Sequence, residues 1–429
     1  MTLLGEIERR AGVQATADDG VLKFITAGSV DDGKSTLIGR LLHDTRAVLE
    51  DQLAAITHAS RKRGFDELDL SLLTDGLEAE REQGITIDIA YRYFATPRRK
   101  FIIADAPGHE QYTRNMVTGA STADAAVILV DARKGLLDQS KRHLLIAHLM
   151  GIRHVIVAVN KMDLVAHGQR VFETVRAAFQ AFAAPLEIQG MQFIPLSALR
   201  GDMVVERGTN LAWYEGPTLL EALEGIRVED EVAALPFRFP VQLVLRPGAG
   251  SEARGYMGRV AAGTVRPGDE VVALPSGRRT VVEKILTLDG ARPSAAAGDS
   301  VTLLLAGELD ISRGDMLADA QHAPRAAKSS SAVLCWLSSE PMAPNGRYLL
   351  RHTTRTVKAP LASIDSRLDI HTLDKQPFAG ELAMNDIVHA SFVAQQPIFC
   401  DAYAESRATG AFILIDEATN QTVAAGMIA

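Results

Sequence analysis

Residues 28–35 read Gly28-Ser29-Val30-Asp31-Asp32-Gly33-Lys34-Ser35, and this stretch, directly after the apolar run 22–27, decides the fold. A glycine-rich loop between a strand and a helix lets successive backbone N–H groups surround an anionic phosphate chain. Lys34 adds a charge that can reach the β- and γ-phosphates, and the Ser35 hydroxyl can ligate Mg²⁺. The sequence therefore predicts a nucleotide-binding loop from Gly28 to Thr36.

The composition predicts a folded protein of two or three domains. Its 429 residues exceed one ordinary core, and 47% of them are apolar. A net charge of −8 argues against binding nucleic acid or membranes through bulk charge, so we expect no stable nucleic-acid partner. The two cysteines, Cys335 and Cys400, lack metal-ligand spacing, which favours reduced thiols and a cytoplasmic protein. No signal-peptide core or membrane-length apolar run is present, so no membrane association is expected.

The first predicted domain, residues 1–230, alternates β-branched runs with helical patterns such as 141–150 and 171–184. Such alternation is typical of a doubly wound, mostly parallel sheet with helices on both faces. The expected strands are 22–27, 100–104, 125–130, 154–159 and 192–196. This is the α/β fold of a P-loop domain, in which ligands bind at the carboxyl ends of the strands.

Two all-β barrel domains are predicted to follow, over residues 236–322 and 330–429. Short valine-rich runs there alternate with turn signals, the pattern of small antiparallel barrels. The turn signals fall at 266–269, 274–277, 288–290 and 297–299. The polar stretch Gln321–Ser331, with Pro324 and three serines, predicts a linker between the two barrels.

A second motif, Asp105-Ala106-Pro107-Gly108-His109, follows the predicted strand 100–104. An acidic residue at this strand end commonly reaches Mg²⁺, directly or through water. The Gly108 N–H can meet the γ-phosphate and respond when that phosphate leaves. His109 can lie across the γ-phosphate and position the attacking water. An ordinary turn is the alternative, but the position after a strand favours function, so Lys34, Gly108 and His109 are the predicted catalytic residues.

The segment 80–88 offers Thr86 as a hydroxyl that can join Mg²⁺ and the γ-phosphate only in the triphosphate state. A capped strand start is the alternative reading of this segment. The predicted magnesium ligands are therefore Ser35, Thr86 and Asp105.

A third motif, Asn160-Lys161-Met162-Asp163, ends the predicted strand 154–159 and selects the base. The Asp163 carboxylate can accept two hydrogen bonds from guanine, which adenine cannot supply, and an unpaired buried carboxylate is costly. Lys161 can lie along the purine, and Asn160 can tie the loop to its neighbours. Ser197-Ala198-Leu199, after the next strand, can complete the pocket through backbone N–H groups. The predicted nucleotide is GTP.

With these motifs in order, the chain resembles the translation-factor class of GTPases, most specifically over residues 105–120. The resemblance implies a GTPase domain followed by two β-barrels. Elongation factor Tu and its relatives, which deliver aminoacyl-tRNA, are one reading within this class. They usually carry His at the place of Ser29, Asp at that of Gln111 and Arg at that of Gln83, so the chain departs from them.

At these positions the sequence instead resembles the large, GTP-hydrolysing subunit of bacterial sulfate adenylyltransferase. The similar segments are 28–42, 80–94, Arg254-Gly255-Tyr256, Leu288-Asp289-Gly290, 310–315 and 410–416. This resemblance implies that a separate small, ATP-pyrophosphatase-like subunit makes adenylylsulfate and pyrophosphate from ATP and sulfate, driven by GTP hydrolysis on this chain. The single phosphate loop agrees, because ATP should then bind to the partner. Some family members carry a fused adenylylsulfate kinase; since this sequence ends at Ala429, we expect that activity to be absent.

Overall fold

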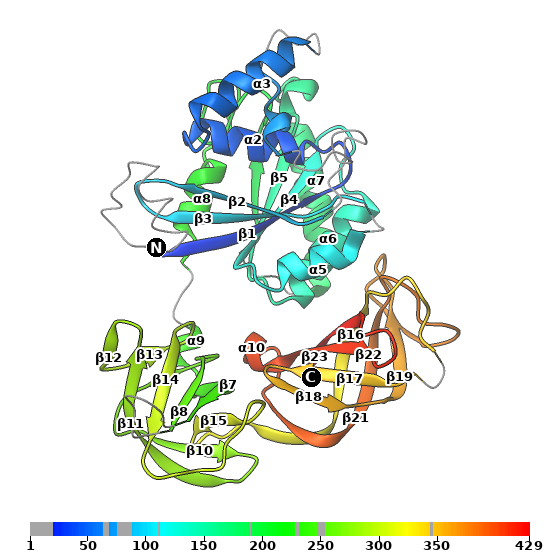
Figure 1. The fold of residues 1–429 in the computed structure, drawn as a ribbon. Coiled ribbons are helices and arrows are strands. Elements are labelled where there is room, and N and C mark those ends of the chain that lie inside the picture. Colours follow the sequence, from blue (N-terminus) through cyan, green and yellow to red (C-terminus); the bar gives the residue numbers. More distant parts are fainter. Residues whose placement is uncertain are drawn as a thin grey trace. The chain divides into compact units, whose positions relative to one another are not determined.

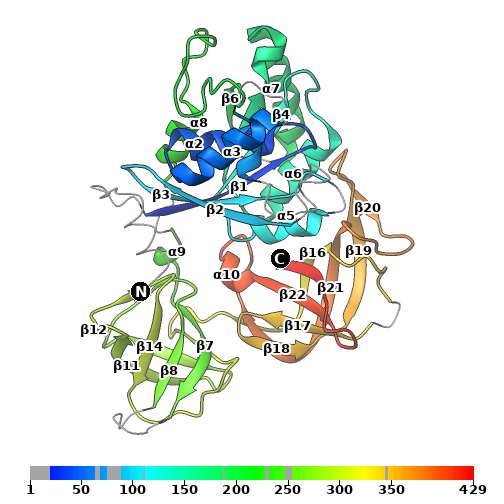
Figure 2. The ribbon, with the colours of Figure 1, turned by 45° about the horizontal axis from the view of Figure 1, so that its top comes forward.

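The computed structural model describes residues 20–62, 68–74, 88–109, 112–186, 188, 190–227, 231–246, 254–343 and 346–429. The chain divides into two compact units. The first holds Met1–Val228 with Ile370–Thr372, and the second holds Glu229–Asp369 with Leu373–Ala429. Figures 1 and 2 show the elements of both units from two directions. Among the described residues, no helix is both long and apolar enough to cross a membrane.

The first unit is built on a six-stranded sheet with the strand order β2-β3-β1-β4-β5-β6. All neighbouring strands run parallel except β2, which pairs antiparallel with β3. The five predicted strands are confirmed, and β2 is an additional edge strand. The bounds are β1 Val21–Gly28, β2 Ala90–Ala95, β3 Lys100–Asp105, β4 Ala125–Asp131, β5 His154–Asn160 and β6 Gln192–Pro195. Every residue of β4 is buried, as expected for a central parallel strand.

Helices lie on both faces of this sheet; in Figure 1, α2 lies above it, and α5 and α6 lie below. The first unit contains α2 Lys34–Asp44, α3 Glu50–Lys62, α5 Thr113–Ala120, α6 Asp138–Leu149, α7 Gln169–Ala183 and α8 Leu219–Gly225. Short 3-10 turns cover Leu70–Leu73, Met162–Val165 and Ala184–Leu186. In α7, Phe172, Val175 and Phe179 recur at helical spacing and are buried, which explains why this segment folds onto the sheet.

The second unit begins with the short helix α9 Glu231–Ala234 and a seven-stranded antiparallel sheet in the order β10-β15-β7-β8-β14-β11-β12. Because β10 also pairs with β11, the sheet closes on itself as a barrel. Its strands are β7 Arg238–Leu245, β8 Gly255–Arg259, β10 Glu270–Leu274, β11 Arg278–Thr287, β12 Gly290–Arg292, β14 Ser300–Leu305 and β15 Met316–Asp319. A two-stranded ribbon joins β9 Thr264–Val265 to β13 Ala295–Ala296. All four predicted turns fall at junctions between successive strands, although Leu274 still belongs to β10 and Gly290 already belongs to β12.

An eight-stranded antiparallel sheet follows, in the order β18-β17-β22-β23-β16-β21-β19-β20, with the short helix α10 Arg407–Gly410. Its strands are β16 Arg325–Trp336, β17 Tyr348–His352, β18 Arg355–Lys358, β19 Leu361–Leu368, β20 Lys375–Pro377, β21 Ile387–Cys400, β22 Ala411–Asp416 and β23 Thr422–Ile428. Trp336, Leu350, Phe392 and Leu414 belong to its core. The α/β domain followed by two antiparallel β domains confirms the expected fold class.

The predicted linker Gln321–Ser331 is wrong for most of its length, because β16 already begins at Arg325. The polar residues Ser329–Ser331 pair with β21, and Ser330 is buried. Cross-strand pairing thus outweighs the local turn propensity of a serine run. Only residues 320–324 lie outside the strands at this point.

Two arginines join the two sheets of the second unit. Arg238 of β7 donates from Nε and Nη2 to the two carboxylate oxygens of Asp401, at 3.0 and 2.9 Å. Thr409 donates to the same carboxylate at 2.6 Å. Although burial raises the pKa of Asp401, the bonds from Arg238 and Thr409 hold it below its ordinary value. Arg355 of β18 makes the second link, from Nη1 to Asp315 Oδ1 at 3.4 Å.

Candidate functional site

The predicted nucleotide-binding loop lies where the sequence places it, between the end of β1 and the start of α2. The loop closes on itself, because Asp32 N–H donates to Ser29 O at 3.2 Å and Ser29 N–H donates to Asp32 Oδ2 at 2.8 Å. Gly33 caps the helix with φ +91°, a conformation that L side chains rarely adopt. A Cβ at this position would also come within 2.5 Å of Asn160 Nδ2. Position 33 therefore requires glycine for two independent reasons.

The second motif reaches the loop through Asp105 and Gly108. Asp105 ends β3, and its Oδ1 lies 2.5 Å from Lys34 Nζ, with both side chains nearly fully buried. A Cβ at Gly108 would approach Gly28 O to 2.6 Å, so only glycine allows this close packing. Ala106 and Pro107, between them, are buried. The parallel register of β1 and β3, with Thr26 beside Asp105, is what brings the two motifs together.

His109 lies next to Gly108 and is exposed. Its ring contacts Tyr112 edge-on, with 6.1 Å between ring centroids. Val30 and Asp31 of the loop are also exposed, while Ser35 and Thr36 are half-buried in the first turn of α2. Thr86, the third predicted magnesium ligand, lies outside the described residues. The roles of Lys34, Gly108 and His109 in catalysis, and of Ser35 and Asp105 at Mg²⁺, remain predictions.

Asn160 joins the third motif to both of its neighbours. Its Nδ2 donates to Asp32 O at 2.7 Å, and its Oδ1 accepts the Ala198 N–H at 2.9 Å. The predicted tying role of this side chain is therefore seen directly. Lys161, in the left-handed region at φ +63°, donates to the Asp31 carbonyl. One amide thus couples the loop that surrounds phosphates to the loop that is expected to surround the base.

Asp163 is half-buried, so it is accessible to a base. Its Oδ1 accepts a hydrogen bond from Ser197 Oγ at 2.6 Å, and Met162 and Ala198 beside them are buried. Leu199 is 50% exposed. Binding of guanine by Asp163 and by residues 197–199 stays a prediction.

Sequence reasoning missed Asp131, the last residue of β4, which is fully buried. It accepts bonds from Arg133 Nε at 3.0 Å and Nη2 at 2.6 Å, and Lys161 Nζ lies 3.1 Å away. Burial raises the pKa of Asp131, but the bonds from Arg133 and Lys161 hold it well below its usual range. An acidic residue at the carboxyl end of a central strand was the signal that could have identified it. Asp131 fixes the lysine that is expected to lie along the purine.

Sequence reasoning also missed Arg40 on α2, which holds the loop after β6. Its Nε donates to Ala198 O at 3.1 Å and its Nη2 to Leu199 O at 2.5 Å. An arginine four residues before Asp44 reads as an ordinary surface pair, and that contact also exists at 3.7 Å. Its role became visible only with the tertiary structure.

Asp32 is unusual among the loop residues because it is 1% exposed. Burial raises the pKa of Asp32 to about 6, although the Ser29 N–H and the charge of Lys134 lower it. Within the described part of the chain, its Oδ1 has no hydrogen-bond partner, and the buried Ser29 hydroxyl has none either. The loop thus contains two unsatisfied polar atoms on its buried side.

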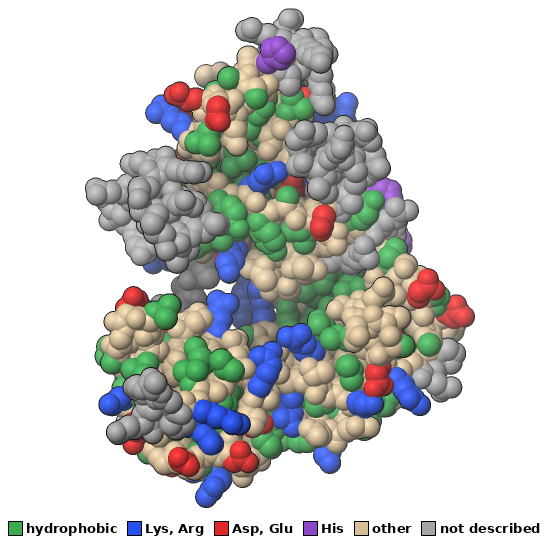
Figure 3. All heavy atoms as spheres, in the orientation of Figure 1, with side chains coloured by type: hydrophobic (Ala, Val, Ile, Leu, Met, Phe, Trp, Pro, Cys, Tyr) green, Lys and Arg blue, Asp and Glu red, His purple; other side chains and the backbone are tan. Residues whose placement is uncertain are grey.

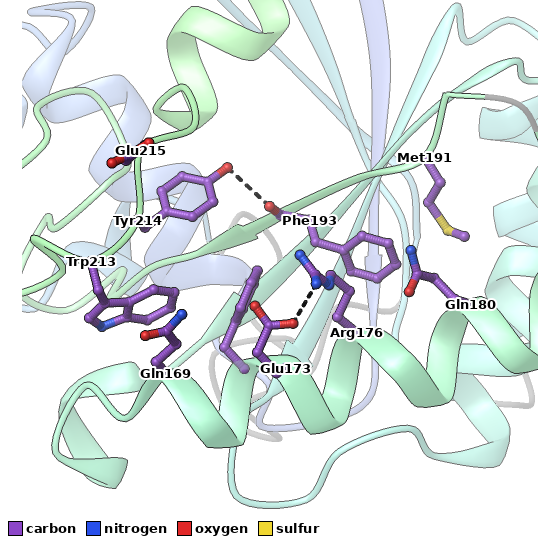
Figure 4. Close-up of a pocket in the computed structure, with 10 residues that line it drawn as sticks. Gln169, Glu173, Arg176, Gln180, Met191, Phe193, Trp213, Tyr214 and Glu215 are labelled. Carbon is purple, nitrogen blue, oxygen red and sulfur yellow. Dashed lines mark hydrogen bonds and ion pairs between the residues drawn. The ribbon is translucent and has the colours of Figure 1, made fainter.

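A separate groove of about 400 Å³ runs along α7 and β6 (Figure 4). Its aromatic walls are Phe172, Phe193, Trp213 and Tyr214. Tyr214 Oη donates to Phe193 O at 3.0 Å, and Trp213 Nε1 donates to His167 O at 2.8 Å. None of the predicted site residues lines this groove, so it is separate from the nucleotide site.

The described members of all the motifs therefore meet at the carboxyl ends of the parallel strands. They form one hydrogen-bonded network that runs from Asp105 through the phosphate loop and Asn160 to residues 197–199. This is where an α/β sheet of this kind binds its ligand. The arrangement suits a nucleoside phosphate, with lysine and backbone N–H groups at one end and a half-buried carboxylate at the other.

Comparison with protein families assigns each part of the chain. Residues 19–228 match the elongation factor Tu GTP binding domain. Residues 256–318 match elongation factor Tu domain 2, and residues 329–429 match the GTP-eEF1A C-terminal domain-like family. The first match shows a GTP-binding domain.

Known proteins match nearly the whole chain. Sulfate adenylyltransferase subunit 1 of Aeromonas salmonicida is 49% identical over 429 residues, which cover 100% of this chain and 90% of that protein. The same subunit of Alteromonas mediterranea is 50% identical, with 95% and 86% covered. The bifunctional enzyme CysN/CysC of Mycobacterium tuberculosis is 52% identical, with 95% and 67% covered.

Among solved structures, sup35 complexed with GDP is similar at 23% identity and a TM-score of 0.43, covering 95% of this chain and 93% of that one. The structural score is low, and the sequence relatives carry the assignment. The chain therefore belongs to the sulfate adenylyltransferase subunit 1 family of GTP-binding proteins.

Proposed function

We propose that this chain binds GTP with Mg²⁺ and hydrolyses it, and that this hydrolysis drives the formation of adenylylsulfate and pyrophosphate from ATP and sulfate on a second, smaller subunit. The observation that carries the proposal is the network around the phosphate loop. It connects Lys34 and Asp105 at one end with Asn160 and Asp163 at the other, as one nucleotide requires. The names of the relatives support the second half, because a subunit 1 implies another subunit of the same enzyme.

The residues present fit a magnesium nucleotide. Ser35 lies in the first turn of α2 and Asp105 at the end of β3, and both supply the oxygen donors that Mg²⁺ prefers. Among the described residues, no three His, Cys, Asp or Glu side chains form a metal cluster, so an ion here would depend on nucleotide oxygens and water as well. When bound, Mg²⁺ would neutralise charge on the phosphate oxygens.

The chain's own groups would then act in sequence along the phosphates. Lys34 must exchange Asp105 for the β- and γ-phosphate oxygens, because its ammonium group is now 2.5 Å from that carboxylate. Gly108 can donate its N–H to the γ-phosphate, and His109 can orient water there. In the proposed cycle, loss of the γ-phosphate releases the Gly108 contact, which is a change that the rest of the enzyme can sense.

The test is GTP hydrolysis by the chain with a candidate small subunit, ATP and sulfate, measured beside adenylylsulfate formation. We expect hydrolysis and adenylylsulfate formation to depend on one another. His109→Ala should slow hydrolysis with little loss of GTP affinity, whereas Asp163→Ala should weaken GTP binding. Stimulation by ribosomes and charged tRNA alone would refute the sulfate role and favour a translational GTPase. Unchanged turnover in His109→Ala would remove that residue from the mechanism.

Two further assignments belong to the same proposal. We divide the chain into a GTP-binding domain at 1–230 and two barrels at 236–322 and 330–429, and the family matches at 19–228, 256–318 and 329–429 support this division. We also place the protein in the cytoplasm. The support is that Cys400 is a buried thiol outside any disulfide, as suits a reducing compartment.

A further inference from the structure

The phosphate loop contains a carboxylate that the proposed hydrolysis does not use. Asp32 is 1% exposed, and its Oδ2 accepts the Ser29 N–H at 2.8 Å. Its Oδ1 has no hydrogen-bond partner in the part of the chain that the structure describes. A buried oxygen without a donor is costly while the group carries a charge. The protonated form of this side chain avoids that cost.

The groups that face Asp32 come from three elements. The Ser29 N–H of its own loop favours the ionised form, and so do Lys134, after β4, and Lys161, after β5. Asp131, at the end of β4, opposes it, and the same carboxylate already contacts Lys161 at 3.1 Å. Burial outweighs the favourable contacts and raises the pKa of Asp32 to about 6. The carboxyl group thus changes between its two forms near pH 6.

We propose that Asp32 takes up one proton from the solvent when this loop binds the phosphate chain of a nucleoside triphosphate. The proposal rests on GTP binding at this loop and concerns the same site. When a nucleotide is bound, its negatively charged phosphates would lie against the backbone of residues 28–35. The Asp32 carboxyl group is buried beneath the same backbone. Like charges separated by a thin, poorly polarisable layer repel, and protonation of one of them removes the repulsion. Only an O–H bond to the carboxylate forms, and release of the nucleotide returns the proton.

The pH dependence of GTP affinity follows from the protonation of Asp32 in the free and in the nucleotide-bound chain. In the free chain Asp32 holds a proton below about pH 6, so nucleotide binding takes up none there and affinity is highest. Bound phosphate shifts the midpoint to higher pH, and above that midpoint Asp32 is ionised in both states and affinity is lowest. One unit of such a shift corresponds to about a tenfold change in affinity. We therefore expect GTP affinity to fall about fivefold between pH 6 and pH 8, because half of the free chains already hold the proton at pH 6.

Calorimetric titration with a non-hydrolysable GTP analogue and Mg²⁺ tests the proposal. The wild-type chain and Asp32→Asn are titrated across this pH range in buffers that differ in ionisation enthalpy, which reports protons taken up on binding. Asparagine keeps the acceptor for Ser29 N–H and removes the charge. Asp51→Asn is the matched control, because Asp51 is an exposed carboxylate on α3. Protons that belong to the nucleotide are the same in all three titrations and cancel in the comparison.

On binding near neutral pH, the wild-type chain and Asp51→Asn should each take up as much as one proton more than Asp32→Asn. The GTP affinity of Asp32→Asn should also vary less with pH. The same pH profile in all three chains would overturn the proposal. If Asp32→Asn does not fold, Asp32→Ser, which keeps a short acceptor, takes its place. Infrared difference spectroscopy of the wild-type chain then looks for a protonated carboxyl band that appears with the nucleotide. An absent band overturns the proposal, whereas a wild-type chain that binds no GTP refutes the proposed function instead.

Discussion

Lys34–Asp105 in the first unit and Arg238–Asp401 in the second are buried to a similar degree, with side-chain exposures of 7% and 2% against 5% and 14%. They differ in how the cation is held. Lys34 approaches one oxygen of Asp105 as a point charge, and it is the first residue of α2, directly after the phosphate loop. Arg238 donates through two parallel bonds to both oxygens of Asp401, and Thr409 adds a third.

The difference shows how one kind of interaction serves two purposes. A lysine can give up a carboxylate for a phosphate without losing a fixed geometry, because its ammonium group donates in any direction. The planar fork of an arginine makes a bidentate pair specific and hard to exchange. We infer that the first pair is temporary and belongs to the nucleotide cycle, whereas the second is permanent and joins two sheets.

Removing the cation from the temporary pair should have the largest effect on activity. In Lys34→Ala the phosphates lose their charged donor, so we expect GTP hydrolysis to fall on the order of 10²–10³-fold. The measurement is single-turnover hydrolysis at saturating GTP. Arg238→Ala is the contrasting variant and should hydrolyse GTP at a nearly unchanged rate. An equal loss in both variants would contradict the division of roles.

Removing the cation from the permanent pair should have the largest effect on stability. Arg238→Ala leaves the largely buried Asp401 carboxylate without its cation and with only the Thr409 donor, and the loss of one partner of such a pair typically costs about 3–5 kcal/mol of unfolding free energy. Denaturant unfolding followed by tryptophan fluorescence measures it, since Trp336 lies in the core of the second unit.

Two variants make this stability test specific. Arg279→Ala removes a cation from the exposed pair with Glu270 and should change stability by less than about 1 kcal/mol. The double variant Arg238→Met with Asp401→Leu should recover most of the lost stability, because it leaves no buried charge. An Arg238→Ala variant no less stable than Arg279→Ala would show that the pair is dispensable.

Acid should weaken the Arg238–Asp401 pair, because Asp401 loses its charge when it is protonated. The folded-state pKa of Asp401 lies below the ordinary value of 3.8, so the ionised group contributes stability above that pH. This contribution is lost as the pH falls through the folded-state value. We expect Asp401→Asn to be less stable than the wild-type chain at pH 7 and to show a smaller further loss in acid. Parallel unfolding curves at pH 7 and pH 3 measure the difference, and equal acid sensitivity would exclude Asp401 as a cause.

Asp131 should give the smallest effect, because it acts on the nucleotide only through Lys161. In Asp131→Asn, Lys161 loses a charged partner but keeps its bond to the Asp31 carbonyl. We expect GTP affinity to fall roughly fivefold, or about 1 kcal/mol. Binding of a fluorescent GTP analogue measures it, and a Lys161→Ala variant, which removes the side chain itself, should bind more weakly still. A loss larger than that of Lys161→Ala would mean that Asp131 acts directly.

The main site could be predicted because its residues lie next to each other at strand ends. Once β3, β1, β4 and β5 run parallel in that order in one sheet, the motifs at residues 28–35, 105–109 and 160–163 must meet at the same edge. The contacts of Arg40 and the burial of Asp32 depend on elements distant in sequence, and no local pattern encodes them. The linker error has the same cause, since the serines of β16 are held by β21 rather than by their own propensity.

The early start of β16 has a practical consequence for work with isolated fragments. A fragment that begins at residue 330 would lack residues 325–329, and Ile398–Cys400 of β21 would lose the strand that pairs with them. Open backbone at a sheet edge invites pairing with other molecules, so such a fragment should aggregate. The fragment would also lack β7 and with it Arg238, so Asp401 would have no cation. Both sheets of the second unit therefore need to be produced together, from the start of β7 onward.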